Sequence, residues 1–409
     1  MCGLPDILVT LLILGGCFLL ANAVLVALFS KPLLALWREP ALRVPVVIFE
    51  SDDWGAGPTE QASALRRLRL ILARHTDRSG RHPVMTLGLT LAAPAVQARP
   101  GADFVYARRL LDDPAHSPIL AEIRQGIRDG VFAAQLHGME HFMPAVACDV
   151  ATHEPAVRDW LARGDQYSEL LPDYLQSRWI DARQLPSTEH AEALIEAEVA
   201  MEVKVFSQLF GHAPAVVVPN TFAWTRAVER AWARHGLRYL VTCGRRFVAR
   251  DVAGRLVDDG AVLRNGDGSG GLLCLVRDAY FEPAKGHRAR DTAPMLQNYI
   301  DCARPLLFET HRCNFTALNP AAEQAFAELD ALIAALLEQC PGVRFLSTEE
   351  LGDAVASGDR TVIAHRFPMR FRAWLQRASR LPAFRRYARL SGAGLLISLL
   401  LLVLRPQAD

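Results

Sequence analysis

Short apolar runs rich in β-branched residues alternate with longer amphipathic stretches through the middle of this chain. The short runs are typical of strands, and apolar residues at three-to-four spacing in the longer stretches predict helices. The predicted strands are Val44–Phe49, Pro83–Leu89, Val131–Leu136, Ala215–Val218, Leu237–Thr242, Leu272–Val276, Pro305–Phe308 and Val343–Leu346. The predicted helices are Glu60–Arg74, Ile119–Arg128, Glu189–Phe210, Arg226–His235, Ala293–Cys302 and Ala321–Leu337. This alternation favours an α/β fold with a parallel sheet, and seven or eight such units indicate a barrel.

The segment 143–186 interrupts the alternation. It is polar, carries several aromatic residues and follows a predicted strand. We expect an irregular insertion over the barrel mouth, with ordinary surface helix and loop as the alternative. The chain then has three predicted parts, which are an anchor over 1–43, a barrel over 44–364 and a membrane-associated segment over 365–409.

Both ends of the chain have membrane-like patterns. Residues 7–30 contain no charged side chain, which is about the length that a transmembrane helix needs. Eight arginines interleave with aromatic and leucine side chains over 366–389, with no acid among them. Such a stretch suits the headgroup zone of an anionic membrane. The apolar run 390–404 is short for a full span, so we expect it to cross with distortion or only to dip into the bilayer.

Charge and cysteine content narrow the possible partners and compartment. The formal net charge is +1, so no global field points to nucleic acid as a partner. None of the eight cysteines forms a CxxC pair, which argues against a zinc ribbon or a thioredoxin-type site. Positive residues flank the central part on both sides. The positive-inside rule then predicts attachment to the cytoplasmic membrane with the central part on the cytoplasmic face.

Polar clusters follow five of the predicted strands. In a parallel barrel, the carboxyl ends of the strands share one face, and sites are built on that face. We therefore expect the five clusters to form one site. They are Glu50–Gly55, His137–His141, Pro219–Trp224, Arg277–Glu282 and Glu309–Arg312.

Three of these residues have the chemistry of a divalent-metal site. His137 and His141 are four apart, so on a helical turn both imidazoles would face one side. Asp53 supplies a carboxylate, and Asp52 beside it ionises more easily if a cation is near. Two histidines and one carboxylate leave positions open for water and substrate, as hydrolytic metal sites require. Zn²⁺ fits this ligand set best, and other first-row metals fit as well.

Further residues at the strand ends could act on a substrate. His311 ends the last clear strand and could protonate a leaving amine, with Glu309 among the residues that could tune it. Aromatic side chains pack well against sugar rings, so we expect aromatic and polar residues at the mouth of the barrel to bind a sugar. The expected substrate-binding residues are Trp54, Asn220, Trp224, Arg277, Glu282 and Arg312.

At these residues the chain resembles the polysaccharide deacetylase (NodB-like) superfamily, over roughly 44–352. The superfamily opens with an Asp-Asp pair after its first strand, continues with HxxxH and closes with a strand-end histidine. The matching residues are Asp52, Asp53, His137, His141 and His311. The resemblance implies a distorted (β/α)₇-type barrel, the second aspartate and the histidine pair as metal ligands, the first aspartate as general base and the late histidine as general acid.

The motifs look closer to an uncharacterised branch of that superfamily with an ESDDWG opening, present here as Glu50–Gly55. Other blocks that look like this branch are His137–His141, Pro219-Asn220, Phe281–Pro283, Thr310–Phe315 and Leu346–Gly352. One departure concerns the third motif, which in the superfamily usually carries an arginine that orients the base. No arginine precedes Pro219 in that block, and Arg277 or Arg312 could replace it.

The expected activity is metal-dependent hydrolysis that removes an N-acyl or O-acyl group from a glycan. The membrane ends suggest a lipid-linked sugar, because a tether keeps the site near the bilayer. Two other classes stay open. A glycoside hydrolase on a related barrel would use paired carboxylates from Glu140, Glu282 and Glu309, and a decayed metal site would leave an inactive membrane scaffold.

Overall fold

The computed structural model describes residues 4–95 and 106–404. These residues form two compact units. The sheet unit holds 46–296 and 305–357, and the terminal unit joins both ends of the chain with the short segment 297–304.

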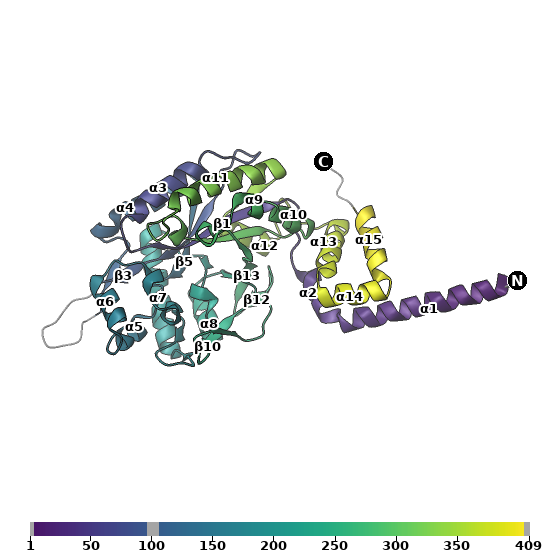
Figure 1. Ribbon diagram of the computed structural model, residues 1–409, viewed down its shortest axis with the longest axis horizontal. Coiled ribbons are helices and arrows are strands. Elements are labelled where there is room, and N and C mark those ends of the chain that lie inside the picture. The colour runs from purple at the N-terminus through teal and green to yellow at the C-terminus, as the bar shows by residue number, and fades with distance from the viewer. Residues whose placement is uncertain (1–3, 96–105, 405–409) are drawn as a thin grey trace. The chain divides into compact units, whose positions relative to one another are not determined.

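The sheet unit is built on one ten-stranded sheet (Figure 1). Its strands are β1 (Val46–Gly55), β2 (Met85–Thr90), β5 (Phe132–Gly138), β8 (Val216–Val217), β9 (Tyr239–Thr242), β12 (Gly268–Ser269), β13 (Leu272–Val276), β14 (Ala279–Tyr280), β15 (Leu306–His311) and β16 (Arg344–Phe345). The order is β12-β13-β9-β8-β5-β2-β1-β15-β14, and β16 pairs with β1. All pairings are parallel except β12 with β13.

The sheet confirms a mixed α/β fold and is consistent with a distorted barrel. All eight predicted strands are present, with ends that differ by up to three residues except at β1, which continues six residues past the predicted Phe49. Strands β12 and β14, of two residues each, are too short to give a periodic sequence signal. They end the sheet order, and no pairing between them closes the sheet within the described residues. The sheet is therefore a curled partial barrel.

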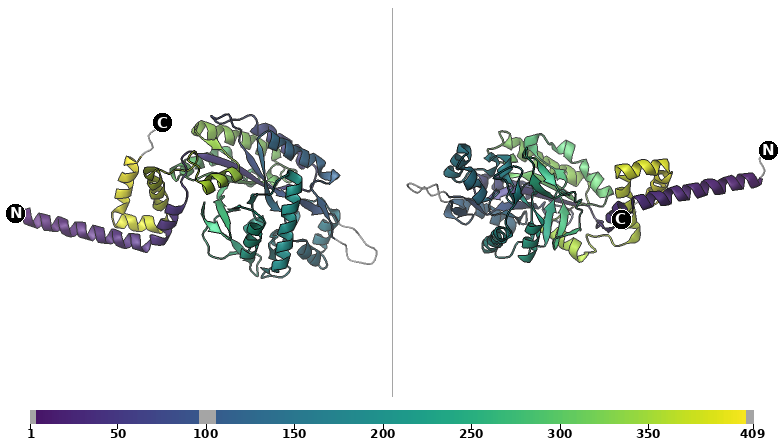
Figure 2. Two further views of the ribbon diagram at one scale, coloured as in Figure 1. Left: turned by 180° about the vertical axis from the view of Figure 1, so that it is seen from behind. Right: turned by 90° about the horizontal axis from the view of Figure 1, so that it is seen from below.

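Helices cover the outside of the sheet (Figures 1 and 2). They are α3 (Gln61–Leu72), α4 (Ser117–Arg128), α7 (Glu192–Phe210), α8 (Arg226–Arg234), α11 (Ala322–Gln339) and α12 (Thr348–Ser357). Their inward faces follow the three-to-four spacing, as Leu329, Leu332 and Leu336 of α11 are all fully buried. All but α12 were predicted, and the sixth predicted helix is α10 (Met295–Asp301) at the border of the two units.

The segment 143–186 has a small core of its own. It contains α5 (Pro144–Val150), α6 (Pro155–Arg163) and the 3₁₀ turns η2 (Ser168–Leu170) and η3 (Asp173–Gln176). Aliphatic and aromatic side chains of these elements bury one another, and Phe142 packs edge-on against Trp160 at 5.3 Å. The segment is therefore a packed subdomain within the sheet unit.

The terminal unit is helical. Its helices are α1 (Leu4–Leu28), α2 (Ser30–Arg38), α13 (Phe367–Ser379), α14 (Pro382–Leu390) and α15 (Ala393–Val403). Within the described residues, only Leu8–Leu28 of α1 is by itself long and apolar enough to cross a membrane. Helices α14 and α15 meet that test only together, with a bend of 105° between them. The predicted apolar helix at the N-terminus is present, and the C-terminal apolar run is a short helix.

Candidate metal centre

The end of strand β1 supplies two adjacent carboxylates. In a regular strand, Asp52 and Asp53 would point to opposite faces. The pairing of β1 with β2 shifts register between Ser51 and Trp54, and Asp53 has a φ of 74°. This irregularity brings both carboxylates to one pocket. A left-handed backbone at a residue other than glycine costs about 1–3 kcal/mol and is typical of functional sites.

The neighbouring strand β2 makes room for Asp52 with a glycine. A Cβ atom at Gly88 would lie 2.3 Å from Asp52 Oδ1, which is far inside van der Waals contact. Any larger residue at this position would therefore displace the Asp52 carboxylate.

The two histidines meet through a turn, so the predicted helical turn is wrong. His137 belongs to strand β5, and the chain bends over 139–142 without forming a helix. Gly138 has a φ of 117°, a conformation that ends the strand and that favours glycine. A Cβ there would also lie 2.9 Å from the Glu140 carbonyl oxygen. The turn, and not helical spacing, places His141 beside His137.

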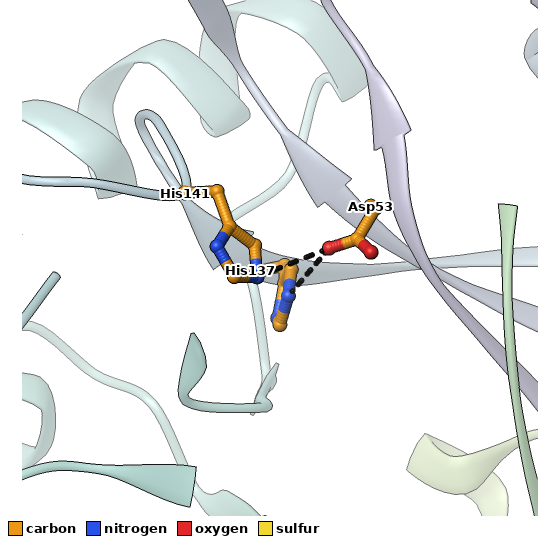
Figure 3. Close-up of side chains that lie close together, drawn as sticks. All are labelled: Asp53, His137 and His141. Atoms are coloured by element: carbon orange, nitrogen blue, oxygen red, sulfur yellow. Dashed lines mark ion pairs between the residues drawn. The ribbon is translucent and has the colours of Figure 1, made fainter. Parts of the chain in front are cut away.

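The side chains of Asp53, His137 and His141 converge on one point (Figure 3). Asp53 Oδ1 lies 3.2 Å from Nε2 of His137 and 3.2 Å from Nε2 of His141. The His137 Nδ1–H group donates to the Val218 carbonyl oxygen at 2.8 Å, so the neutral ring carries its lone pair on Nε2. That lone pair points toward the Asp53 carboxylate.

This donor set fits a divalent cation. Asp53 Oδ1 and His137 Nε2 are buried and have no hydrogen-bond partner, a condition that costs about 1–3 kcal/mol for each group. Burial alone would raise the pKa of Asp53, but His141 and His137 hold that pKa well below its usual range. An ionised carboxylate and two imidazoles with free lone pairs are the ligands that zinc prefers. A bound cation would satisfy the unpaired atoms.

Arg277 holds the carboxylate of Asp52. Its Nη2 group donates to Asp52 Oδ2 at 2.6 Å, and its Nη1 group donates to Glu50 Oε2 at 2.8 Å. Burial would raise the pKa of Asp52, but Arg277 and His137 outweigh it and lower that pKa. Asp52 Oδ1 has no hydrogen-bond partner, so one oxygen is fixed and the other is available as a base. Arg312 makes no such contact and pairs with Glu169 at 2.5 Å.

His311 is paired with a buried carboxylate. It lies opposite Asp52 in the register of β15 with β1. Its Nδ1 atom is 2.5 Å from Glu282 Oε1, and its Nε2 atom is 3.8 Å from Glu309 Oε1. Burial lowers the pKa of His311, but Glu282, Asp53 and Glu309 raise it to about 10. The ring is therefore an imidazolium at neutral pH, with Nε2–H directed away from Glu282.

Glu140, which lies between the two histidines, is held by arginines. Arg178 Nη1 donates to Glu140 Oε2 at 2.8 Å, and Arg108 Nε donates to Oε1 at 2.6 Å. The Tyr106 hydroxyl also donates to Oε1, at 2.9 Å. Arg178 is fully buried and comes from the end of the 143–186 segment. This network ties the histidine turn to that segment and leaves Glu140 no free oxygen for catalysis.

The candidate metal ligands line a pocket of about 380 Å³. The pocket also contains Asp52, Arg277 and His311. Its remaining walls come from the 143–186 segment, the loop after β8, the β10–β11 hairpin (Phe247–Arg250 and Leu256–Asp258) and the loops after β14 and β15. The lining residues from these walls are Glu169, Gln176, Pro219, Thr221, Phe222, Leu256, Lys285 and Cys313, and Glu309 of strand β15 completes the lining.

Most of the predicted substrate-binding residues lie outside this pocket, so only Arg277 of the six lines it. Trp54 is fully buried and donates to Ser51 Oγ at 2.8 Å. Trp224 is also fully buried and donates to Glu229 Oε1 at 2.9 Å. Both indoles belong to the core, where their N–H groups find acceptors.

Asn220, Glu282 and Arg312 act on other side chains. Asn220 Nδ2 donates to the His137 carbonyl oxygen at 2.8 Å and so supports the end of strand β5. Glu282 is 1% exposed and contacts His311. The Arg312 guanidinium lies over the Tyr167 ring at 4.8 Å.

The sequence placed Phe222 in one of the strand-end clusters but gave it no role, and its ring lies 5.2 Å from the Arg277 guanidinium. Thr221 and Phe222 both have a φ of 53°. Threonine and phenylalanine rarely adopt this left-handed conformation, so the sequence does not predict it. Lys285 follows a 3₁₀ turn, η5 (Pro283–Lys285), whose sequence looks like any surface turn.

Comparison with known proteins gives low-identity structural likenesses. No protein-family model matches the chain, and no curated protein matches it. The 4-alpha-glucanotransferase from Thermococcus litoralis shares 10% identity with a TM-score of 0.41, over 88% of this chain and 48% of that one, so this chain spans about half its length. A family 4 acetyl xylan esterase from Clostridium thermocellum, solved with cobalt, shares 12% identity with a TM-score of 0.38, over 78% and 94% of the chains.

A family 4 carbohydrate esterase from Streptomyces lividans, solved with acetate, shares 10% identity with a TM-score of 0.34, over 75% of this chain and 93% of that one. At such identities the likeness concerns the fold.

Proposed function

We propose that this protein is a metal-dependent hydrolase that removes an acyl group from a glycan. The observation that carries the proposal is the convergence of five side chains on one pocket. Asp53 Oδ1 and His137 Nε2 are unpaired, His141 Nε2 lies 3.2 Å from the same Asp53 oxygen, and Asp52 and His311 lie beside them with opposite charges. Hydrolysis of an amide or ester needs an electrophile, a base and an acid in this arrangement.

Each of the five side chains has a defined role in the proposed reaction. Asp53, His137 and His141 would hold a divalent cation, which when bound polarises the acyl oxygen and makes water more acidic. Asp52 accepts the proton of the attacking water on Oδ1, while Arg277 keeps Oδ2 in place. His311 donates its Nε2 proton to the leaving nitrogen or oxygen. Glu282 stabilises the imidazolium and fixes its orientation.

Two of the acids that a glycoside hydrolase could use, Glu140 and Glu282, already make hydrogen bonds to other side chains. Glu140 is bound by two arginines and a tyrosine, and Glu282 is bound by His311 and by Asn314. Glu309 lies 3.2 Å from Arg277 Nε. The hydrogen bonds of Glu140 and Glu282 favour acyl hydrolysis over cleavage of a glycosidic bond, in which one carboxyl group must be free to protonate the bond.

We propose further that the protein is anchored in a membrane by α1 and acts on a lipid-linked or membrane-adjacent sugar. The apolar stretch Leu8–Leu28 supports the anchor. The positive residues after it, Lys31, Arg38 and Arg43, favour the cytoplasmic face.

Acetate release from N-acetylated and O-acetylated sugar oligomers tests the proposed reaction. The full chain, loaded with Zn²⁺, is expected to release acetate without releasing reducing sugar ends. Asp52→Asn removes the base at constant size and should reduce the rate by about 100-fold or more, while leaving the metal content unchanged. Release of reducing ends instead of acetate would refute the proposal, as would an Asp52→Asn variant with the wild-type rate.

A further inference from the structure

Three arginines of α14 have no acidic partner. Arg385, Arg386 and Arg389 are exposed, and their guanidinium groups make no hydrogen bond or ion pair with any part of the chain that the structure describes. The sequence holds no acid at all over 360–408. No carboxylate of this segment can therefore neutralise the charge of these arginines.

Three other arginines of the terminal unit have partners. Arg304 forms two hydrogen bonds of 2.7 Å with Glu39. Arg377 is buried and donates to backbone carbonyl oxygens, including those of Cys302 and Glu39. Arg380 lies 3.5 Å from Asp301. Helix α14 therefore carries three unpaired charges within nine residues, and Lys31, Arg38, Arg360, Arg366 and Arg372 of the same unit also have no acidic partner among the described residues.

Helix α14 lies beside the C-terminal end of α1 (Figure 1). The Phe384 ring packs edge-on against Phe29 at 5.5 Å, and the Ser391 hydroxyl donates to Asn22 Oδ1 at 3.0 Å. The apolar stretch of α1 ends at Leu28. If α1 crosses a bilayer, α14 therefore lies within about 10 Å of the level where α1 leaves the hydrocarbon. Arginine side chains reach headgroups from such a depth.

Apolar and aromatic surface adjoins the arginines. On α15, Leu395 is 71% exposed and Val403 is 82% exposed, and Leu390 at the end of α14 is 77% exposed. Tyr387 of α14 is 51% exposed, and the half-buried Trp37 and Trp374 pack against each other at 6.2 Å. Cations beside exposed aliphatic and aromatic side chains match a lipid interface, in which one part of the surface is apolar and the next is charged. A nucleic-acid site would not leave these aliphatic side chains exposed.

We propose that the face of α14 that carries Arg385, Arg386 and Arg389 binds the headgroups of anionic phospholipids. The opposite face, with Phe384 and Ala388, is buried against the other terminal helices, so the arginines are held outward. The binding gives the terminal unit a preference for anionic lipid that the apolar α1 cannot supply. It is independent of the hydrolase chemistry.

Quenching of tryptophan fluorescence by brominated lipid tests the proposal. The full chain is reconstituted in phosphatidylcholine nanodiscs that contain a minor fraction of either brominated phosphatidylglycerol or brominated phosphatidylcholine. Trp37 and Trp374 lie in the terminal unit, and the other five tryptophans are buried in the sheet unit and give a constant background. Each arginine near the membrane surface enriches anionic lipid around the protein by about fivefold. We expect at least about threefold more quenching by the anionic lipid, and less at high salt.

Two triple variants separate this effect from total charge. The α14 variant carries R385Q, R386Q and R389Q, and the control variant carries R66Q, R163Q and R344Q at exposed positions of the sheet unit. The α14 variant should lose the preference, and the control should keep it. All six sites are exposed, so circular dichroism should be unchanged.

Several results would overturn the proposal. Equal quenching by the two lipids in the wild type would do so, as would equal preference in the two variants. Binding of single-stranded RNA that only the α14 variant loses, without a lipid preference in the wild type, would assign the surface to nucleic acid instead.

Discussion

The short contact between His311 Nδ1 and Glu282 Oε1, at 2.5 Å, carries the acid role of His311. Glu282→Gln keeps the size of the side chain and removes its charge. An adjacent opposite charge moves a pKa by about 1–3 pH units, so we expect the pKa of His311 to fall from about 10 by about two pH units. The imidazolium donates its proton only below its pKa. The alkaline limb of the kcat/KM profile should therefore move to lower pH by a similar amount.

Nuclear magnetic resonance measures this change without a substrate. The chain has 12 histidines, so a His311→Gln spectrum identifies the His311 Hε1 signal in ¹³C-labelled full chain. The titration midpoint of that signal is then compared in the wild type and in Glu282→Gln. Glu323→Gln is the matched control, since Glu323 is exposed and pairs with Arg67. The reasoning fails if the midpoint in Glu282→Gln equals that of the control.

The same pair affects stability with a defined sign. The pKa of His311 in the folded protein, about 10, lies above its ordinary value. The imidazolium therefore contributes stability that is fully present below about pH 6.5 and is lost as the pH rises toward 10. Each pH unit in this window changes the free energy of unfolding by about 1.4 kcal/mol for one proton. Glu282→Gln should flatten that dependence in urea unfolding curves, and an unchanged slope would contradict the assignment.

Three further predictions follow from contacts around the site. Gly88→Ala places a Cβ atom 2.3 Å from Asp52 Oδ1, so acetate release should fall by about tenfold or more while the melting temperature changes little, because the strain falls on one carboxylate. Arg277→Lys removes the planar guanidinium whose two Nη groups bind Asp52 and Glu50, so kcat should fall by about 100-fold at unchanged metal content. A wild-type kcat would exclude the orienting role. Glu140→Ala frees the histidine turn, and competition with a chelator should show zinc affinity weaker by about 10–100-fold, whereas Glu196→Ala on the exposed face of α7 should leave it unchanged.

The strands and most helices could be predicted because their apolar periodicity is local. The grouping of Asp53, His137 and His141 could also be predicted, since each follows an apolar run that ends at one face of a parallel sheet. The geometry that joins them could not. The left-handed conformation of Asp53 depends on contacts with β2, and the turn at Gly138 depends on its close approach to the Glu140 carbonyl oxygen. No pattern in the sequence indicates either contact.

The indoles were assigned wrongly to the substrate because a tryptophan in a strand-end motif has two uses. Trp54 and Trp224 find buried acceptors for their N–H groups, and only the fold reveals those acceptors. The role of Arg277 is a similar case. The sequence offered Arg277 and Arg312 as replacements for the orienting arginine, and only the fold shows that Arg277, directly after strand β13, is the one that reaches Asp52. Pairings across the sheet decide such contacts, and a single sequence does not contain them.

The central claim is that Asp53, His137 and His141 hold a divalent cation. Anomalous diffraction at the zinc edge, from crystals of the full chain loaded with Zn²⁺, tests it most directly. A single strong peak is expected at about 2.0–2.2 Å from Asp53 Oδ1, His137 Nε2 and His141 Nε2. No peak there, or a peak only among Glu282, Glu309 and His311, the other described group that could hold an ion, would contradict it.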